Sequence, residues 1–315
     1  MEAVYIECLN ACFDGWGGPG MYRWCFARTV GSHPADLMVL EEDGHPIAGS
    51  AINYRHVSLA NNAAILVAVM TGSWTLPAAR QKGCFKRIIQ ESLALAEERG
   101  AALLLAFVTE SNPSSRGLEA AGSAMFPTHY LFSRSDSPAP QSEASTVIVE
   151  DTQPTAEIIE DRLSVDRAGH SRVAYTAAQW RSQFLERPYH TELLSIEREG
   201  LAVVETKGNS DHVQFISPRG AASFDVCLGA LHGRAATRGR QLVLFTTSAR
   251  WAESCVRAGF ERVQGYLTAL VADAGILAPA IPGAKGVTLD RSRPLSDSED
   301  PGYLGPWDIQ SGDRM

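Results

Sequence analysis

The segment Thr75-Leu-Pro-Ala-Ala-Arg80-Gln-Lys-Gly83-Cys-Phe-Lys-Arg-Ile-Ile89 decides how this chain is interpreted. The residues before it, 63–70, are strongly apolar and partly β-branched, a composition that favours a β-strand. The residues after it predict an amphipathic helix over 83–99, because apolar side chains recur there at helical spacing. The segment therefore joins a buried strand to a helix through a short loop that contains Arg80 and Gly83.

Such a loop has the chemistry of an anion-binding site. The first turn of a helix exposes about four N–H groups without intrahelical partners, and it carries a partial positive charge. Gly83 lets the backbone approach a ligand closely because it has no Cβ. Lys82, Lys86 and Arg87 add cationic side chains. The pattern indicates a pyrophosphate-binding turn; an ordinary strand-to-helix turn is the alternative, because Arg-x-x-Gly by itself often arises by chance.

The flanking sequence predicts a mixed α/β domain around this turn. Helices are expected over 2–14 and 21–30, and strands over 37–42 and 47–57 with a turn at Asp43-Gly44. The all-apolar run 103–109 indicates a strand that is buried on both faces. Asn112-Pro113 then begins a helix, and a strand through Tyr130 completes this half.

The second half of the chain repeats much of the first. Trp24 precedes the turn at Gly44 by 20 residues, and Trp180 precedes a turn at Gly200 by the same 20 residues. The offset between the copies is 156 residues. A tandem duplication accounts for this regularity.

The second copy lacks about 18 residues around the central strand and the long helix, and it has Pro218-Arg219-Gly220 where the loop belongs. We therefore expect it to bind no cofactor and to cover the first copy instead, forming part of a second pocket between the domains. The expected limits are residues 1–135 for the first domain, 136–145 for a linker, 146–272 for the second domain and 273–315 for a Pro/Gly-rich tail. Within that tail, 287–289 is a candidate edge strand.

Composition excludes several classes of protein. The 315 residues carry a net charge of −8, which argues against a protein that tracks nucleic-acid phosphates. No apolar run reaches the length of a membrane span. The six cysteines are scattered, so neither a zinc site nor a disulfide framework is indicated. We expect a cytoplasmic monomer or homodimer without a metal.

The central segment resembles motif A of the GCN5-related N-acetyltransferase (GNAT) superfamily. The matching residues of its acyl-CoA loop are Arg80, Gln81, Lys82, Gly83, Cys84 and Phe85. Phe85 departs from the motif, since Gly or Ala is common at that position. The resemblance implies an α/β fold (an α+β mixed sheet) made of two tandem GNAT-like domains, of which the second is degenerate.

The same resemblance implies where acetyl-CoA, or another acyl-CoA, is bound. The donor would lie along the central strand at Met70, Thr71 and Thr75, with its pyrophosphate on the motif A loop. Asn112 matches an asparagine that often contacts the CoA arm, and a helix cap is its equally favoured alternative. A backbone N–H of the strand would then stabilise the developing oxyanion.

The catalytic residues are less evident. The strand 67–74 has no carboxylate where the family often has a glutamate base, so Tyr54 and His56 on a neighbouring strand are candidates, with Thr71 and Ser73 nearby. Leu118 stands where the family usually has its tyrosine acid, and Tyr130 or His129 is a substitute.

The leading function is therefore N-acetyl transfer from acetyl-CoA to a primary amine of a small molecule, by direct attack. A non-catalytic acyl-CoA binder or sensor is the second candidate, because the usual acid and base are missing. An aminoacyl-tRNA-dependent peptide-bond former is the third, since such enzymes also have tandem domains of this type.

Overall fold

The computed structural model describes residues 2–13, 15–30, 33–134, 148–151, 169–196, 199–220, 222–281, 304 and 306–314. The expected linker 136–145 and the candidate edge strand 287–289 lie outside these residues. No helix of the described part of the chain is long and apolar enough to cross a membrane. Within the same residues, no group of three or more His, Cys, Asp or Glu side chains is arranged to hold a metal ion.

Twelve strands of the described residues form one continuous mixed sheet that runs through both halves. Along the sheet the order is β1-β2-β3-β4-β12-β5-β11-β10-β9-β8-β6, with β7 paired to β2. The strands are β1 Asp36–Glu42, β2 His45–Ser58, β3 Ala64–Thr75, β4 Leu103–Thr109, β5 Ala124–Phe132, β6 Ile148–Asp151, β7 Arg172–Val173, β8 Thr191–Ile196, β9 Gly200–Lys207, β10 Ser210–Pro218, β11 Gln241–Thr246 and β12 Glu261–Val271.

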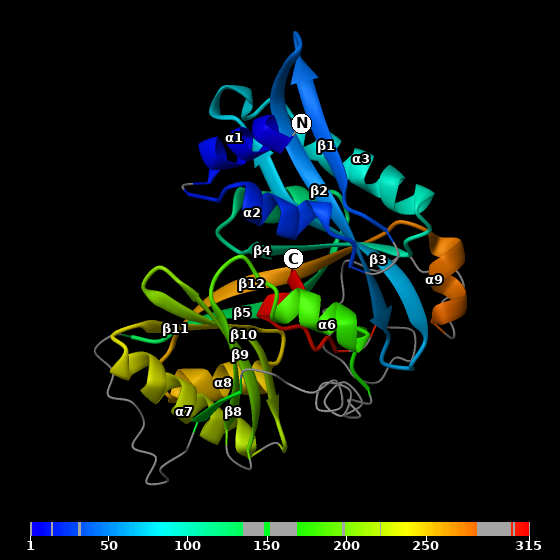
Figure 1. The fold of residues 1–315 in the computed structure, drawn as a ribbon. Coiled ribbons are helices and arrows are strands. Elements are labelled where there is room, and N and C mark those ends of the chain that lie inside the picture. The colour runs from blue at the N-terminus through cyan, green and yellow to red at the C-terminus, as the bar shows by residue number, and fades with distance from the viewer. Residues whose placement is uncertain are drawn as a thin grey trace.

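The two halves are joined because they exchange their last strands. β12, from the second half, pairs antiparallel with β4 from Val271↔Leu103 to Gly265↔Thr109. β5, from the first half, pairs with β11, and β12 lies between β4 and β5. Figure 1 shows these strands running through the middle of the molecule, where the halves meet. The exchange has a physical reason: the unpaired edge of each half is covered by a strand of the other.

Helices cover the sheet in both halves. α3 (Cys84–Glu98) packs on the first-half strands, and Ile88, Ile89 and Ala96 are buried as the predicted helical face requires. In the second half α7 (Ser223–Thr237) and α8 (Ala249–Arg257) bury the corresponding core. The remaining helices are α1 Glu2–Cys12, α2 Pro19–Tyr22, α4 Pro113–Ala120, α6 Ala177–Phe184 and α9 Ala274–Ala280, with a π-helix at Arg23–Ala27 and 3-10 turns at Pro77–Ala79 and Ser311–Arg314.

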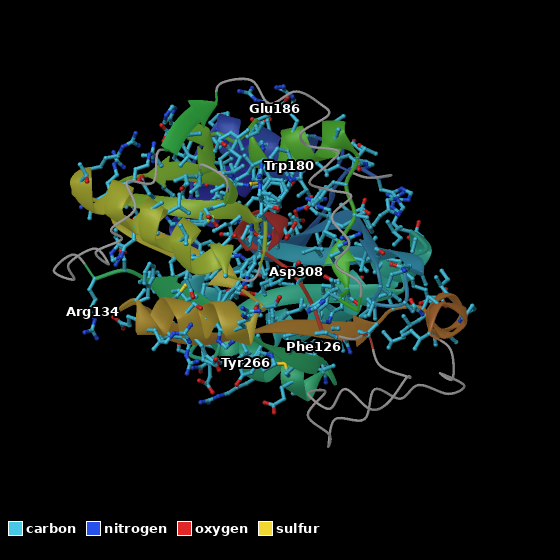
Figure 2. All side chains as sticks on the ribbon, turned by 90° about the horizontal axis from the view of Figure 1, so that it is seen from below. Phe126, Arg134, Trp180, Glu186, Tyr266 and Asp308 are labelled. Atoms are coloured by element: carbon cyan, nitrogen blue, oxygen red, sulfur yellow. The ribbon has the colours of Figure 1, made fainter. Side chains whose placement is uncertain are left out.

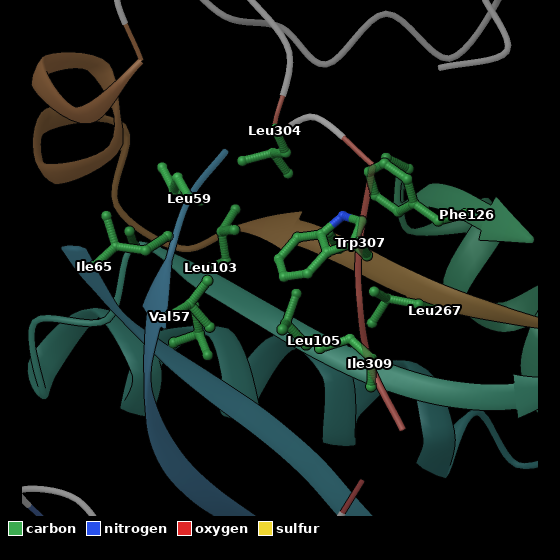
Figure 3. Packing of buried hydrophobic residues seen from close by; sticks show 14 of the residues in the cluster. Val57, Leu59, Ile65, Leu103, Leu105, Phe126, Leu267, Leu304, Trp307 and Ile309 are labelled. Atoms are coloured by element: carbon green, nitrogen blue, oxygen red, sulfur yellow. The ribbon is translucent and has the colours of Figure 1, made fainter. Parts of the chain in front are cut away.

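The described residues near the C-terminus, 304 and 306–314, lie between the two halves. Trp307 is buried in a hydrophobic cluster that both halves contribute to, and it packs edge-to-face on Phe126, with ring centroids 5.9 Å apart. Figure 3 shows its indole beside Leu105 and Leu267, with Ile309 and Leu304 on either side in the chain. Beyond it, the 3-10 turn Ser311–Arg314 packs on β10 and β11. We call residues 304–314 the C-terminal strap.

A second contact between the halves is built on Trp24. The guanidinium carbons of Arg28 and Arg187 lie 4.0 Å and 4.3 Å from its ring centroid, in cation–π contact. Arg28 also donates to Gln183 Oε1 of α6 at 2.6 Å. Figure 2 shows the side chains of both halves between the ribbons, with Arg134 at the edge of the molecule. The halves therefore form one packed body through side chains as well as through the sheet.

Candidate functional site

The sheet opens at the end of the parallel pair β3–β4. These strands pair from Val67↔Leu103 to Met70↔Ala106, and no further pair follows. β3 nevertheless continues to Thr75, so its edge facing β4 has no strand partner over its last five residues, 71–75. The backbone N–H and C=O groups on that edge need other hydrogen-bond partners, which a ligand with amide groups can provide.

A β-bulge in β3 lies at the opening of the sheet. Against β2, Thr71 pairs with Ala51 and Trp74 pairs with Gly49, so Gly72 and Ser73 together oppose the single residue Ser50. Gly72 has a φ of 57°, which a glycine adopts without strain. The hydroxyls of Ser50 and Ser73 hydrogen-bond at 2.8 Å. The bulge lies just past the point where the pairing of β3 with β4 ends, and a bulge bends the strand that contains it.

The N-terminus of α3 has the geometry that the sequence predicts for an anion site. Gly83 is its N-cap, with a left-handed φ of 78°, and no side chain caps the helix. The first helical hydrogen bond runs from Arg87 N to Gly83 O at 3.2 Å. The N–H groups of Cys84, Phe85 and Lys86 therefore precede the first intrahelical bond and remain available to phosphate oxygens.

A groove of about 1110 Å³ extends from this helix terminus between α3 and α4 to the end of β3. The structure brings seven predicted donor-site residues together along it: Thr75, Arg80, Gln81, Gly83, Cys84, Phe85 and Asn112. Lys82 is not part of its wall, because its ammonium forms an exposed ion pair with Glu42 at 2.7 Å. The thiol of Cys84 is buried and donates to Ala79 O at 3.6 Å, so this side chain contributes to packing.

The groove has a neighbour that accommodates Phe85 and a residue, Asn112, that also caps a helix. Phe85 has room because α4 presents Gly117 to it: a Cβ on Gly117 would lie 2.8 Å from the phenyl ring. Asn112 caps α4, since its Oδ1 accepts from Ser114 N at 2.9 Å, and it also lines the groove. The capping interpretation of Asn112 is thus confirmed, and the residue lines the groove as well.

A second cavity, of about 560 Å³, lies between the halves. Met70 and Thr71, predicted as donor-site residues, line this cavity rather than the groove. The two spaces meet at shared wall residues from β3, from α3 and from the ends of α1 and α4: Phe13, Ser73, Phe85, Asn112 and Ser114. A ligand lying in the groove therefore reaches the second cavity through the opening of the sheet.

The cavity between the halves has titratable groups on its second-half wall. Arg187 Nε lies 3.1 Å from Glu205 Oε1, and both side chains are 6% exposed. Gln214 Nε2 donates to Glu205 Oε2 at 2.7 Å. Burial lowers the pKa of His212, so its imidazole is neutral at pH 7. Sequence reasoning missed this wall because its residues belong to no motif.

The cavity also receives a residue of the C-terminal strap. Arg314 lies on its wall, with its guanidinium carbon 4.3 Å from the Phe245 ring centroid and 5.0 Å from that of Tyr130. Lys207 lies nearer the surface, 5.2 Å from the ring of Tyr189, which also lines the cavity. From the sequence we expected the second copy to cover the first. That expectation indicates that the second half forms a wall of the cavity, but it does not identify the residues of that wall.

The structure does not bring the three catalytic candidates together. Tyr54 is fully buried, and its hydroxyl donates to Asp36 Oδ2 at 2.7 Å beside Arg99, at the opposite end of α3 from Gly83. His56 is exposed on β2 and lies on neither the groove nor the cavity. Tyr130 lies behind Arg314 and is not part of the cavity wall.

The structure also places the other residues that the sequence offered for acid–base chemistry. Leu118, at the position of the family's tyrosine acid, is 1% exposed and lies against the cavity. His129 is buried and outside both spaces, and its pKa is lowered chiefly by burial. Ser73 lies at the junction of the two spaces. Two further side chains that can transfer protons, His212 and Tyr189 of the second half, line the cavity.

The corresponding opening in the second half is filled by the chain itself. β10 and β11 are parallel and pair only as far as Val213↔Leu244. Gln310 of the C-terminal strap enters this gap: its Oε1 accepts from Ile216 N at 2.7 Å, and its Nε2 donates to Ile216 O at 3.1 Å. Gln310 also forms an antiparallel bridge with Thr246 of β11. The strap thus satisfies backbone groups on both strands of the gap.

No protein-family model matches this chain, and no curated protein sequence matches it. Solved structures do match. A conserved protein of unknown function from Enterococcus faecalis V583 is 11% identical, with 89% of this chain and 72% of the other covered and a TM-score of 0.61. A GCN5-related N-acetyltransferase from Sphaerobacter thermophilus is 16% identical, with 86% and 93% covered and a TM-score of 0.56.

A third match is itself a tandem protein. The tandem GNAT protein of the clavulanic acid biosynthesis pathway, solved without AcCoA, is 13% identical, with 86% of this chain and 95% of the other covered and a TM-score of 0.57. These likenesses extend over both halves. They confirm the predicted fold: a mixed α/β structure of the GCN5-related N-acetyltransferase type, in tandem.

Proposed function

We propose that this protein is an acyl-CoA-dependent N-acyltransferase that transfers acetyl from acetyl-CoA to a primary amine of a small molecule. One observation carries the proposal. The groove that begins at the free N–H groups of α3 meets a separate cavity at the opened end of β3, through the five wall residues that the two spaces share. A transferase needs such a junction, because donor and acceptor must enter from different sides and meet at one point.

The described residues fit the donor. The N-terminus of α3 and the exposed guanidinium of Arg80 suit a pyrophosphate, and the unpaired edge of β3 suits an amide-bearing arm. Acetyl-CoA supplies an activated thioester. The backbone N–H groups of β3 beyond Met70 are positioned near the junction, where one of them stabilises negative charge on the thioester oxygen.

The cavity wall supplies the proton transfers. The amine must lose a proton before it attacks, and His212 is a neutral imidazole that accepts it, directly or through water. The departing thiolate needs a proton, and Tyr189 is the tyrosine of this wall. The new C–N bond replaces the C–S bond, so the reaction requires no oxidant or reductant.

The second half then has a supporting role. Gln310 and the strap occupy the gap between β10 and β11, the position equivalent to the donor-binding opening of the first half. This supports the expectation that one acyl-CoA site is present per chain. The second half contributes acceptor-side residues instead.

The test is release of free CoA from acetyl-CoA by the full chain, measured with a thiol reagent against a panel of small primary amines. We expect amine-dependent CoA release and an N-acetyl product of the corresponding mass. Tight binding of acetyl-CoA without release for any amine would favour a non-catalytic binder, which the leucine at position 118 makes the second candidate. Absence of binding would refute both.

A further inference from the structure

We propose that the amine acceptor carries a carboxylate, which binds between Lys207 of β9 and Arg314 of the C-terminal strap. This inference rests on the proposed function and names its substrate class. The described lining residues include three side chains that are cationic at neutral pH, Arg187, Lys207 and Arg314, and one carboxylate, Glu205.

The single carboxylate is already neutralised within the protein. Glu205 is 4% exposed, with one oxygen 3.1 Å from Arg187 Nε and the other bound by Gln214 Nε2 at 2.7 Å. His212, which faces it across β9 and β10, adds no charge because burial lowers its pKa. Arg187 and Glu205 therefore balance one another, and Glu205 is not free to hold the acceptor's ammonium group.

Lys207 and Arg314 remain as cations without a carboxylate partner among the described residues, since no carboxylate oxygen of that part of the chain lies within 4.0 Å of either. Two positive groups on one wall repel each other and attract an anion. The net charge of this cavity wall is positive, although the whole chain carries a net charge of −8. The positive charge is therefore local to the cavity.

Arg314 is held in place before any ligand binds. Its guanidinium lies over two aromatic rings, Phe245 and Tyr130, and its Nη2 donates to Ser311 Oγ at 3.2 Å. The strap is fixed in turn by Asp313, which accepts from Tyr175 at 2.9 Å and from Gln310 N at 2.8 Å. A planar guanidinium fixed in this way loses little entropy when it binds a carboxylate through two parallel hydrogen bonds.

The arrangement also orients the acceptor. Lys207 and Arg314 belong to the second half and the strap, whereas the thioester position lies on the first-half wall at Met70–Ser73. A carboxylate held by the two cations directs the rest of the molecule toward β3. An amine without an acidic group would bring only its positive charge into a positive cavity, which disfavours binding. The favoured substrates are therefore amino acids or similar short amines with a carboxylate.

The experiment compares matched pairs of acceptors on the full chain with acetyl-CoA as donor. Each pair is an amino acid and its neutral-headed counterpart, such as phenylalanine with phenylalaninamide, and the N-acetyl product is measured by mass spectrometry. We expect kcat/KM to favour the carboxylate member by about tenfold or more, as one charge-assisted hydrogen-bond pair provides. The preference should decrease toward unity in Lys207→Gln and Arg314→Gln, mainly through KM. Arg181→Gln, an exposed position on α6 outside both spaces, is the matched control and should retain it.

Calorimetry with acetyl-CoA separates the two proposals. If acetyl-CoA does not bind, the proposed function fails. If acetyl-CoA binds and the neutral members are acetylated equally well, or if both variants keep the wild-type preference, the carboxylate assignment is wrong. The same conclusion follows if no amine is turned over and N-acetylphenylalanine stabilises the protein no more than N-acetylphenethylamine in thermal shift, because the two products differ in the carboxylate.

Discussion

Trp307 should hold the C-terminal strap in place, and its removal has a large calculable cost. The side chain is 4% exposed within a hydrophobic cluster built from both halves, and it packs edge-to-face on Phe126 at 5.9 Å. Burying a tryptophan removes roughly 200 Å² from water, worth about 5 kcal/mol, and Trp→Ala substitutions in cores cost about 3–5 kcal/mol. We expect Trp307→Ala to lower the free energy of unfolding by about 4 kcal/mol, or to release the strap if it unfolds locally.

Urea unfolding followed by circular dichroism measures the first outcome, and limited proteolysis with mass spectrometry measures the second. Trp307→Phe is the control. The indole N–H of Trp307 has no hydrogen-bond partner among the described residues, so phenylalanine loses volume but no bond and should cost about 1–2 kcal/mol. A loss below about 1 kcal/mol in Trp307→Ala, with the strap still resistant to protease, would refute the role of this residue as the anchor.

Three further predictions concern the site and its surroundings. Gly117→Ala should weaken acetyl-CoA binding by about tenfold in calorimetry, because its Cβ would lie 2.8 Å from the Phe85 ring and displace it into the groove; unchanged affinity would contradict the assigned contact. Tyr54→Phe should lower the free energy of unfolding at pH 7 by about 1 kcal/mol but leave kcat/KM unchanged, because the Tyr54 hydroxyl donates to Asp36 away from both spaces. The loss of stability should disappear as pH falls through the lowered pKa of Asp36. A fall in kcat/KM would restore Tyr54 as a catalytic candidate. Because burial lowers the pKa of His212, the fall of kcat/KM on the acid side of its pH profile should lie below pH 6.5, and it should vanish in His212→Asn. An unaltered pH profile in this variant would assign proton transfer to another group.

The sequence predicted the local structure of the first half closely. The hairpin, the strand Leu103–Thr109 and the long helix from Gly83 were all expected, because each has a simple apolar period and a clear turn or cap. The helix expected over 21–30 is instead a short α-helix followed by a π-helix that ends at Ala27. β3 extends to Thr75, five residues beyond the predicted end, because the bulge at Gly72 continues the strand past its pairing with β4.

The arrangement of the halves and the acceptor wall were beyond sequence reasoning. Exchange of β5 and β12 depends on which sheet edges meet in space, and the sequence of a strand such as β12 does not specify the strand with which it pairs. His212 and Arg314 lie about 100 residues apart and join Met70 only after folding. The donor site was predictable because its chemistry lies in one contiguous loop, whereas the acceptor site is assembled from distant segments.

Calorimetric titration of the full chain with acetyl-CoA, beside the variant Arg80→Glu, tests the donor site itself. We expect one acetyl-CoA per chain, because the strap fills the second opening. We also expect a loss of affinity of at least tenfold in Arg80→Glu, because a carboxylate then faces the pyrophosphate. Failure of the wild-type protein to bind, two sites per chain, or equal affinity in the variant would contradict these expectations.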